Sequence, residues 1–407
     1  MTDVSYLLSA RAVRERAHQL LALGLADKLP HFRIDLAKLD AIADLVLDVT
    51  RRAYPGGEVP FHSRWRHFVV GGVDRWAAIA DKVNWPNAAS RARAEFDLAI
   101  TSVLLDAGAG AAWRYRDAVT GARIGRSEGL ALASLDMFAR GAFSADASHP
   151  LRADAAKLQH IIVADLERGF QVSADNPLVG LEGRVALLRR LGEVTAAKPD
   201  IFGRKDTPRP GGLFDQLAAG ATGGHLQAAD ILQQVLLQLG PIWPSRLTLQ
   251  GIALGDCWRH ASLVTDDATS GLVPLHKLSQ WLSYSLIEPL QRASLVVENI
   301  DGLTGLAEYR NGGLFVDGGV LVLRDPADAA RAHAVDSLLV VEWRALTVAL
   351  LDRLAALIRQ RTGQTAEQLP LARILEGGSW AAGRKLAFAR RPDGSPPLTI
   401  LSDGTVF

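Results

Sequence analysis

The amino-acid sequence predicts a mainly α-helical, multi-helix globular protein with a few short β-hairpins. Two observations support this fold class. Apolar residues recur at helical spacing over most of the 407 residues, and runs with the alternation of a strand are few and short. The composition, 48% hydrophobic and 22% charged, is typical of a soluble globular chain.

The predicted helices are amphipathic or largely apolar, and several carry terminal signals. The first should end near Gly24, and Pro289 should kink or end the sixth. Asp336 would cap the last helix, with Gly363 just past its end. The helices are expected at residues 7–25, 35–53, 151–170, 181–191, 226–239, 275–300 and 335–361.

Strand signals occur mainly beside turn residues. Gly318-Gly319 lies between two short apolar runs, as in a hairpin turn. Ser402-Asp-Gly404 is a second turn sequence between apolar runs. Short hairpins are therefore expected within residues 116–124, 314–323 and 397–407.

A proline- and glycine-rich segment at residues 198–212 is the best candidate for a linker or loop. A boundary there would separate an N-terminal helical lobe, residues 1–200, from a C-terminal helical lobe with short hairpins, residues 213–407. One integrated domain is the alternative.

The charge balance argues against several classes of partner. Lys and Arg number 45 and Asp and Glu 44, so the net charge is +1 and we expect neither nucleic-acid nor membrane binding. The most apolar stretch, residues 338–351, is interrupted by Glu342 and Arg344 and is shorter than a membrane span. Residues 1–6 lack the features of a signal peptide, so a cytoplasmic protein is expected, with a homodimer left open.

The segment 306–320 carries the densest chemistry. Carboxylates, an arginine, an amide and a phenol stand there between two Gly-Gly pairs, which is what acid–base chemistry on a charged small molecule would need. The alternative is an ordinary hairpin. The candidates are Glu308, Tyr309, Arg310, Asn311 and Asp317.

Residues 61–68 form a second candidate, because two histidines and two arginines surround one tryptophan. His62, Arg64, Trp65, Arg66 and His67 could hold a phosphate or a planar polar group. The alternative is a solvated edge with Trp65 anchored in the core.

Several isolated polar residues complete the set. Arg246 and Asp256 stand in apolar surroundings, and Lys277 and Gln280 share a polar helical stripe for which a solvated face is the alternative. In residues 126–129, helix capping explains Ser127 and Glu128 without catalysis.

Glu342 and Arg344 stand two residues apart on one predicted helix and cannot pair with each other. We favour structural ion pairs for both over support of a site.

The sequence lacks the usual cofactor and nucleophile motifs. It has no phosphate-binding P-loop, no GxGxxG, no His-Glu-x-x-His and no Gly-x-Ser-x-Gly. Cys257 is the only cysteine, which excludes a Cys-rich zinc site. We therefore expect no cofactor and no metal.

Taken together, five motifs resemble the fungal and bacterial uracil-catabolism protein 4 family over nearly the whole chain. They lie at residues 61–68, 126–130, 176–184, 308–313 and 402–407. The resemblance implies a role in the ring-opening uracil catabolic route, in which uracil becomes its ribonucleotide, the ring is opened and urea is released. It further implies a phosphorylated ribosyl substrate such as ribosylurea 5′-phosphate.

A second likeness bears on mechanism. Ala307-Glu-Tyr-Arg310 is similar to the Ala-Asp-Tyr-Arg element of the queuosine-salvage nucleotide glycosylases, α-helical relatives of helix-hairpin-helix DNA glycosylases. Here glutamate replaces aspartate, and Asn-Gly-Gly follows where those enzymes have Val-Pro-Gln. The likeness implies a glycosylase-like helical fold and hydrolysis of an N-glycosidic bond.

Both resemblances lead to one hypothesis, an N-glycosidase that releases urea and ribose 5-phosphate. Glu308 would be the carboxylate at C1′, with Asp317 or Asp256 as the second acid. Arg310, Arg246 and Lys277 would bind phosphate, and residues 62–67 would bind urea or ribose. The binding candidates are His62, Arg64, Trp65, Arg66, His67, Arg246, Lys277, Gln280, Tyr309, Arg310 and Asn311.

Two rival functions remain at this point. One is an amidase or ureidohydrolase acting on a ring-opened pyrimidine, which would need a metal or an activated nucleophile. The other is a non-catalytic partner of a pathway enzyme, for which an exposed apolar patch would matter more than a polar pocket.

Overall fold

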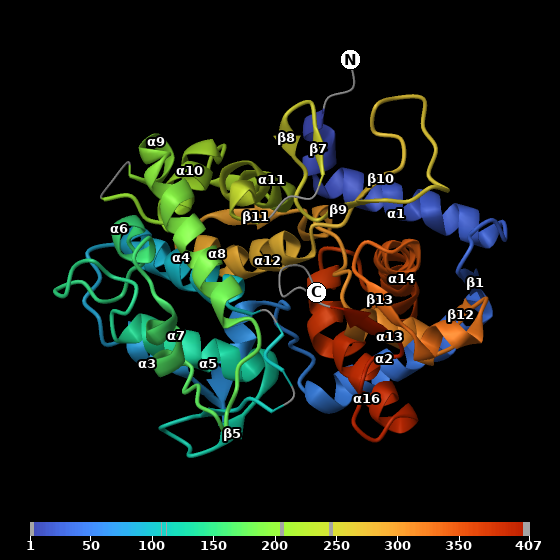
Figure 1. Ribbon diagram of the computed structural model, residues 1–407, viewed down its shortest axis with the longest axis horizontal. Helices are drawn as coiled ribbons and strands as arrows, with labels where there is room; N and C mark the ends of the chain where they lie inside the picture. The colour runs from blue at the N-terminus through green and yellow to red at the C-terminus, as the bar shows by residue number, and fades with distance from the viewer. Residues whose placement is uncertain (1–3, 107, 111, 204–206, 244–246, 402–407) are drawn as a thin grey trace.

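The computed structural model describes residues 4–106, 108–110, 112–203, 207–243 and 247–401, and it shows a mainly α-helical protein (Figure 1). The longer helices are α1 (Ala10–Leu25), α2 (Leu39–Ala53), α4 (Ala88–Leu104), α5 (Arg126–Ala139), α8 (Leu181–Ala196), α11 (Ala228–Leu239), α12 (Lys277–Arg292), α14 (Leu338–Thr362) and α16 (Trp380–Arg390).

Shorter helices connect them. The short α-helices are α3 (Arg75–Ala80), α6 (Ala155–Leu158), α7 (Val163–Gly169), α9 (Pro199–Phe202), α10 (Gly212–Gly220), α13 (Tyr309–Asp317) and α15 (Leu371–Ile374). The 3-10 helices are η1 (Val4–Leu8), η2 (Leu36–Lys38), η3 (Arg64–Phe68), η4 (Gly240–Ile242), η5 (Ile300–Gly302) and η6 (Pro326–Ala330). A π-helical turn, η7 (Leu375–Ser379), joins α15 to α16.

Strands of the described residues are two or three residues long and join in pairs. The antiparallel pairs are β1 (Phe32–Ile34) with β12 (Leu321–Leu323), β2 (Val69–Val70) with β3 (Val73–Asp74), β4 (Tyr115–Arg116) with β5 (Arg123–Ile124), β7 (Thr248–Leu249) with β8 (Ile252–Ala253), and β9 (Cys257–Arg259) with β10 (Leu272–Pro274). The parallel pairs are β6 (His225–Gln227) with β11 (Val296–Glu298) and β13 (Ala332–Ala334) with β14 (Thr399–Leu401).

Helices from the two ends of the chain pack together. Figure 1 shows the blue α1 and α2 beside the orange and red α14 and α16, while the cyan and green helices α4, α5 and α8 form the other side of the molecule. An ion pair between Arg14 on α1 and Asp352 on α14, at 2.9 Å, ties the two ends. The chain therefore crosses between the two sides, and the predicted boundary between residues 200 and 213 stays a prediction.

One cluster of buried apolar side chains extends from Leu8 to Leu398 and includes residues of both sides. Helix α14 runs through it, and two of its charged residues, Glu342 and Arg344, are buried. Glu342 accepts the N–H of Phe32 at 2.8 Å and pairs with His260, whereas Arg344 pairs with Asp256. The expectation of separate structural partners is confirmed.

The prediction of a hairpin at residues 314–323 is wrong. Residues 309–317 instead form α13, because the extended Glu308 accepts the N–H groups of Arg310 and Asn311 and so starts a helix. Gly318 ends α13, and Gly319, with φ of +76°, lets the chain turn into β12, which pairs with the distant β1. The glycine pair marks a helix end.

Other boundaries differ in smaller ways. Residues 151–170 form the two short helices α6 and α7, and α14 is capped by Ser337 in place of Asp336. Pro289 lies in the last turns of α12, which ends at Arg292, and Gly363 ends α14 as expected. The hairpin at residues 116–124 is confirmed as β4 and β5. In the region 397–407, β14 pairs with β13, and residues 402–407 lie outside the described part.

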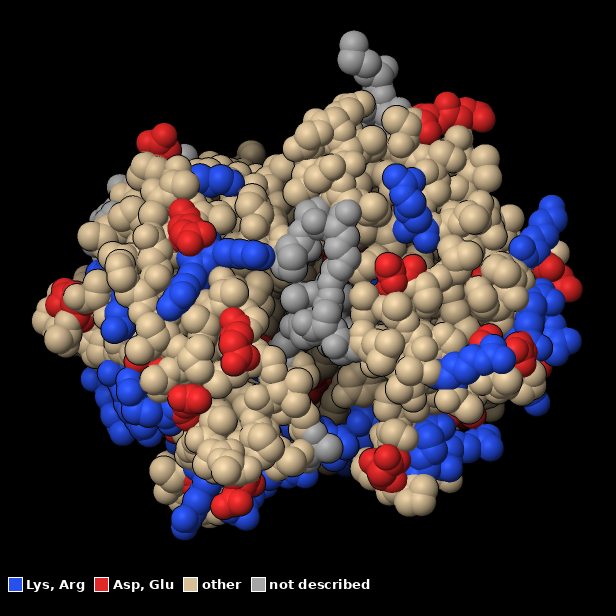
Figure 2. Space-filling view, viewed as in Figure 1, with Lys and Arg blue, Asp and Glu red and all other residues tan. Residues whose placement is uncertain are grey.

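The surface carries charges of both signs. Figure 2 shows Lys and Arg interspersed with Asp and Glu on the visible face, in keeping with the net charge of +1. None of the helices in the described ranges is both long and apolar enough to cross a membrane.

Glycines let α13 approach its neighbours closely. A Cβ at Gly312 would overlap the indole of Trp343 on α14, and one at Gly383 on α16 would overlap the carbonyl oxygen of Arg310. The position of α13 therefore depends on glycine at these two positions, because any side chain there would overlap a neighbour.

Replacement of Gly383 by alanine should lower the free energy of unfolding by roughly 1–3 kcal/mol, because backbone must move to make room. The control is Gly183→Ala on α8, where a Cβ would meet nothing within 4 Å. Because alanine favours a helix more than glycine does, this change should raise the free energy of unfolding by about 0.5–1 kcal/mol. Denaturant unfolding followed by circular dichroism measures both changes. An unchanged midpoint for Gly383→Ala would contradict the packing argument.

Candidate functional site

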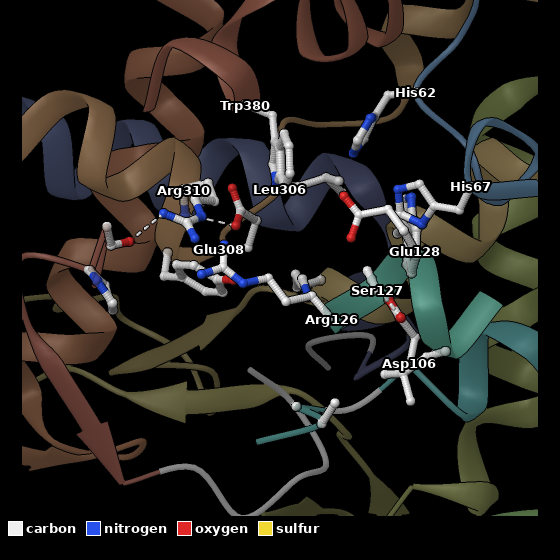
Figure 3. Close-up of a pocket in the computed structure, with 18 of the residues that line it drawn as sticks. His62, His67, Asp106, Arg126, Ser127, Glu128, Leu306, Glu308, Arg310 and Trp380 are labelled. Atoms are coloured by element: carbon white, nitrogen blue, oxygen red, sulfur yellow. Dashed lines mark hydrogen bonds between the residues drawn. The ribbon is translucent and has the colours of Figure 1, made fainter. Parts of the chain in front are cut away.

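A cavity of about 340 Å³ lies between the two sides of the molecule. The segment before α5 and the first turns of α5 and α12 form part of its wall. The start of α13, Trp380, residues 394–396 and the two histidines His62 and His67 form other parts (Figure 3). Its polar lining consists of His62, His67, Asp106, Arg126, Ser127, Glu128, Lys277, Glu308, Tyr309, Arg310 and Ser395.

Glu308 both caps α13 and faces the cavity. Its two carboxylate oxygens accept the backbone N–H of Arg310 at 2.7 Å and of Asn311 at 2.5 Å. Burial raises the pKa of the Glu308 carboxyl, while these two N–H groups and Lys277 oppose the rise. The helix start thus fixes the carboxylate in position and partly compensates its charge.

Lys277, the first residue of α12, also lines the cavity. Burial lowers its pKa, and the nearby Glu308 carboxylate opposes that shift. The backbone N–H of Lys277 is held by Asp256 at 2.9 Å, which takes the place of a capping side chain for α12.

A second carboxyl side chain, Glu128 on α5, enters the cavity from another wall (Figure 3). Asp106 nearby is occupied by protein groups: Arg64 lies 3.0 Å away, and the Ser127 hydroxyl donates to it at 2.5 Å. Arg126 begins α5 with a left-handed backbone, φ of 57°, at the cavity wall. Such a conformation is uncommon outside glycine and asparagine and is often found at functional sites.

Aromatic rings cover much of the remaining cavity wall. Two nitrogens in this wall form no hydrogen bond to the described residues. Trp281, Trp380 and Tyr309 line the cavity, and burial raises the pKa of Tyr309. The buried Nε1 of Trp281 and Nε of Arg310 make no hydrogen bond to described residues. Buried donors are normally satisfied, so both atoms are suited to a bound acceptor.

The two cavity histidines differ in their surroundings. Burial and the neighbouring Arg64 lower the pKa of His67 well below its usual value, so His67 is neutral near pH 7. His62 instead has a carboxylate partner, with Nδ1 at 2.7 Å from Oε2 of Glu376.

Six of the predicted site residues meet at this cavity: His62, His67, Lys277, Glu308, Tyr309 and Arg310. The predicted binding residues Arg64, Trp65, Arg66, Gln280 and Asn311 do not line it. Arg64 supports Asp106, and Trp65 donates to the Ser285 carbonyl at 2.7 Å within the core. Arg246 lies outside the described residues.

The other three contact protein groups as well. Arg66 pairs with Glu288 at 2.8 Å, and Gln280 donates to Thr304 at 2.8 Å. The amide oxygen of Asn311 accepts from Ser379 at 2.8 Å. These contacts hold α12, α13 and the segment 61–68 around the cavity.

The two aspartates proposed as second acids also lie outside the cavity lining. Asp317, at the far end of α13, accepts from Arg391 at 2.8 and 2.5 Å. Asp256 accepts two bonds from Arg344, each of 2.8 Å; burial alone would raise the pKa of this carboxyl, but Arg344 outweighs burial and the pKa is lowered to about 2. Both geometries are those of structural ion pairs.

The comparisons with known proteins place the chain in a family. A family described as "Protein of unknown function (DUF1688)" matches residues 6–407. The chain belongs to this family. It is 40% identical over 412 residues to "Protein urg3" of Schizosaccharomyces pombe, with 99% of each chain covered. It is 36% identical over 441 residues to "Uracil catabolism protein 4" of Lachancea kluyveri, again with 99% of each covered.

Sequence reasoning missed Glu128, Arg126 and Asp106 as cavity residues. The capping explanation for residues 126–129 is only partly right, because Gly125 precedes α5 and Ser127 donates to Asp106. The available signal was the match of residues 126–130 to the family pattern. Trp281 and Trp380 were not predicted as cavity residues, because a lone tryptophan in a helical segment is more often part of the core.

Replacement of Asp256 by asparagine should destabilise the fold at pH 7 by about 3–5 kcal/mol, because it leaves the buried Arg344 charge uncompensated. The pKa of Asp256 is depressed, so its contribution is present above about pH 4 and is lost as pH falls through about 2.

The difference in unfolding free energy between wild type and Asp256→Asn should therefore be smaller at pH 3 than at pH 7, measured by urea denaturation. The exposed Asp44→Asn serves as control. A pH-independent difference would contradict the ion-pair role.

Proposed function

We propose that this protein is an enzyme of uracil catabolism that hydrolyses the N-glycosidic bond of ribosylurea 5′-phosphate, or of a closely related ring-opened nucleotide. The products would be urea and ribose 5-phosphate. A relative of similar length carries the name "Uracil catabolism protein 4", which supports the pathway. The observation that carries the reaction type is a buried carboxylate, Glu308, beside cationic groups in one small cavity.

The reaction needs a carboxylate near C1′. Cleavage of the C1′–N bond develops positive charge on the ribose ring, which a fixed carboxylate stabilises, and the same group can take a proton from the attacking water. Glu308 suits both tasks because α13 holds its oxygens in place. Glu128 is the second carboxyl group available in the cavity, in a place that Asp317 and Asp256 do not reach.

The phosphate of the substrate would lie among Arg126, Lys277 and Arg310, which line the same cavity. Arg310 donates through Nη1 to the Gly394 carbonyl at 2.8 Å, which leaves its buried Nε for a ligand oxygen. The starts of α12 and α13 add the positive ends of two helix dipoles.

Cavity size favours a small substrate. A volume of about 340 Å³ lies at the lower end of the usual range for small-molecule sites, roughly 300–1,000 Å³. The planar urea group can stack on an indole and accept from Nε1 of Trp281. A nucleic-acid duplex would need a much larger basic surface.

Replacement of Glu308 by glutamine should lower kcat for ribosylurea 5′-phosphate by about 10²–10⁴-fold, because the amide neither stabilises the cation nor accepts the proton of water. Urea and ribose 5-phosphate are quantified after incubation with purified protein. The exposed Glu58→Gln is the matched control. Retained binding of ribose 5-phosphate and an unchanged melting temperature would show that the Glu308 variant is folded, and full turnover by that folded variant would exclude the assignment.

The raised pKa of Glu308 gives a further expectation. The active form is the carboxylate, so kcat/KM should rise with pH through an acid limb above the usual glutamate pKa of about 4.3. A pH–rate profile measures this limb. A limb at or below the usual value would contradict the role given to buried Glu308.

A further inference from the structure

We propose that His62 is the proton donor to the departing nitrogen, and that Glu376 is the positioning residue that holds its ring. This assignment rests on the proposed N-glycosidase function. The proposed reaction needs a group that protonates the departing nitrogen, and His62 is assigned that role.

The contacts of Glu376 fix the orientation of His62. Oε2 of Glu376 lies 2.7 Å from Nδ1 of His62, and Oε1 accepts the Tyr54 hydroxyl at 3.0 Å. An ionised carboxylate only accepts hydrogen bonds, so Nδ1 carries the hydrogen and Nε2 is the nitrogen left for the cavity. Figure 3 shows the His62 ring reaching into the cavity from the wall opposite Ser127 and Asp106.

The backbone around Glu376 is built for this contact. Glu376 belongs to the π-helical turn η7. Such turns are rare in proteins, and those that occur are often found at functional sites. A Cβ at Gly378 would come within 2.5 Å of the Val46 carbonyl oxygen and the Thr50 hydroxyl, so η7 packs directly on α2, the helix that leads to Tyr54. The next residue, Ser379, donates to Asn311 of α13 at 2.8 Å.

The turn η7 therefore connects the His62 side of the cavity with the Glu308 side. The backbone N–H of His62 also donates to the Ala372 carbonyl of α15 at 2.9 Å, which fixes the histidine from the same segment. A positive charge on His62 would help lower the pKa of Glu308, which places the two groups within electrostatic reach.

The other acids of the cavity are less suited to donate a proton. Asp106 is held by Arg64 and accepts the Ser127 hydroxyl, so its carboxyl oxygens are already engaged by protein donors. Glu308 is needed as a carboxylate, and no described residue forms a hydrogen bond with the Glu128 carboxyl that would orient it as a donor. A histidine with a carboxylate behind it is the arrangement that stabilises an imidazolium and guides its proton.

The C1′–N bond breaks, its electron pair goes to the urea nitrogen, and Nε2–H of the His62 imidazolium protonates that nitrogen. Water adds its oxygen to C1′ and gives a proton to Glu308, and solvent then returns that proton to Nε2 of His62. The net reaction is hydrolysis, and the Nδ1–H···Glu376 hydrogen bond persists throughout.

The decisive experiment varies the leaving group. His62→Gln and wild type are assayed with ribosylurea 5′-phosphate and with ribofuranosyl fluoride 5-phosphate, whose small leaving group departs as fluoride without a strong acid. We expect the variant to lose about 10²–10⁴-fold in kcat on the urea substrate and less than about tenfold on the fluoride. His149→Gln is the matched control, because His149 pairs with Asp146 at 2.7 Å on the exposed surface.

The outcomes separate the two proposals. No turnover of ribosylurea phosphate by wild type would overturn the proposed function and this assignment with it. Turnover by wild type with equal losses on both substrates in His62→Gln would overturn the acid role alone. Full activity of that variant on both substrates would do the same.

A second measurement tests Glu376 without activity. In protein labelled with ¹⁵N at histidine, the His62 resonances, identified by their loss in His62→Gln, should report the Nδ1–H tautomer. Glu376→Gln should change that signature and lower kcat roughly tenfold or more with KM nearly unchanged. An unaltered tautomer and unaltered kcat in folded Glu376→Gln would overturn the positioning role.

Discussion

The capping of α13 by Glu308 is the constraint on which the candidate site depends. The same carboxylate that satisfies two backbone N–H groups also faces the cavity, so the helix cannot shift without moving the group. At the start of the facing helix, α12, the backbone N–H of Lys277 donates to the Asp256 carboxylate, which fixes the position of Lys277. The start of α13 therefore presents the Glu308 carboxylate and the start of α12 presents Lys277 in one buried space, which suits an anionic phosphate and the positive charge that the proposed reaction develops at C1′.

Buried charges elsewhere in the protein separate into scaffold and site. Glu342 with His260, Arg344 with Asp256, and Arg64 with Asp106 each have protein partners at hydrogen-bond or ion-pair distance. Such groups cost desolvation and are kept only when paired. In contrast, Nε of Arg310 and Nε1 of Trp281 remain without a described partner at the cavity wall. Other buried nitrogens, such as Nε of Arg66, also lack a described partner, but the two at the cavity wall lie where a ligand could accept their hydrogen bonds.

Part of the fold and site could be predicted from sequence because local rules apply to it. Apolar periodicity predicts α1, α2, α11, α12 and α14, and the local chemistry of residues 308–310 predicts Glu308, Tyr309 and Arg310 as site candidates. The prediction of a hairpin at 314–323 was wrong, because a glycine pair indicates a turn but does not show whether a strand or a helix precedes the turn. Asp256 also stood out locally, yet its partner Arg344 lies 88 residues away.

The sequence by itself determined the helical class, the near-neutral charge, the motifs that place the chain in its family, and the residue types available for acid–base chemistry. Only the tertiary structure decided which of these residues share a cavity. His62, Glu128, Lys277 and Glu308 come from four distant segments, and Glu376 reaches His62 across 314 positions through a π-helical turn. Periodicity in the sequence indicates which face of a helix is buried. Which segment packs against that face follows only from the packing of the whole chain. In this protein, glycines allow α13 and η7 to lie directly against their neighbours.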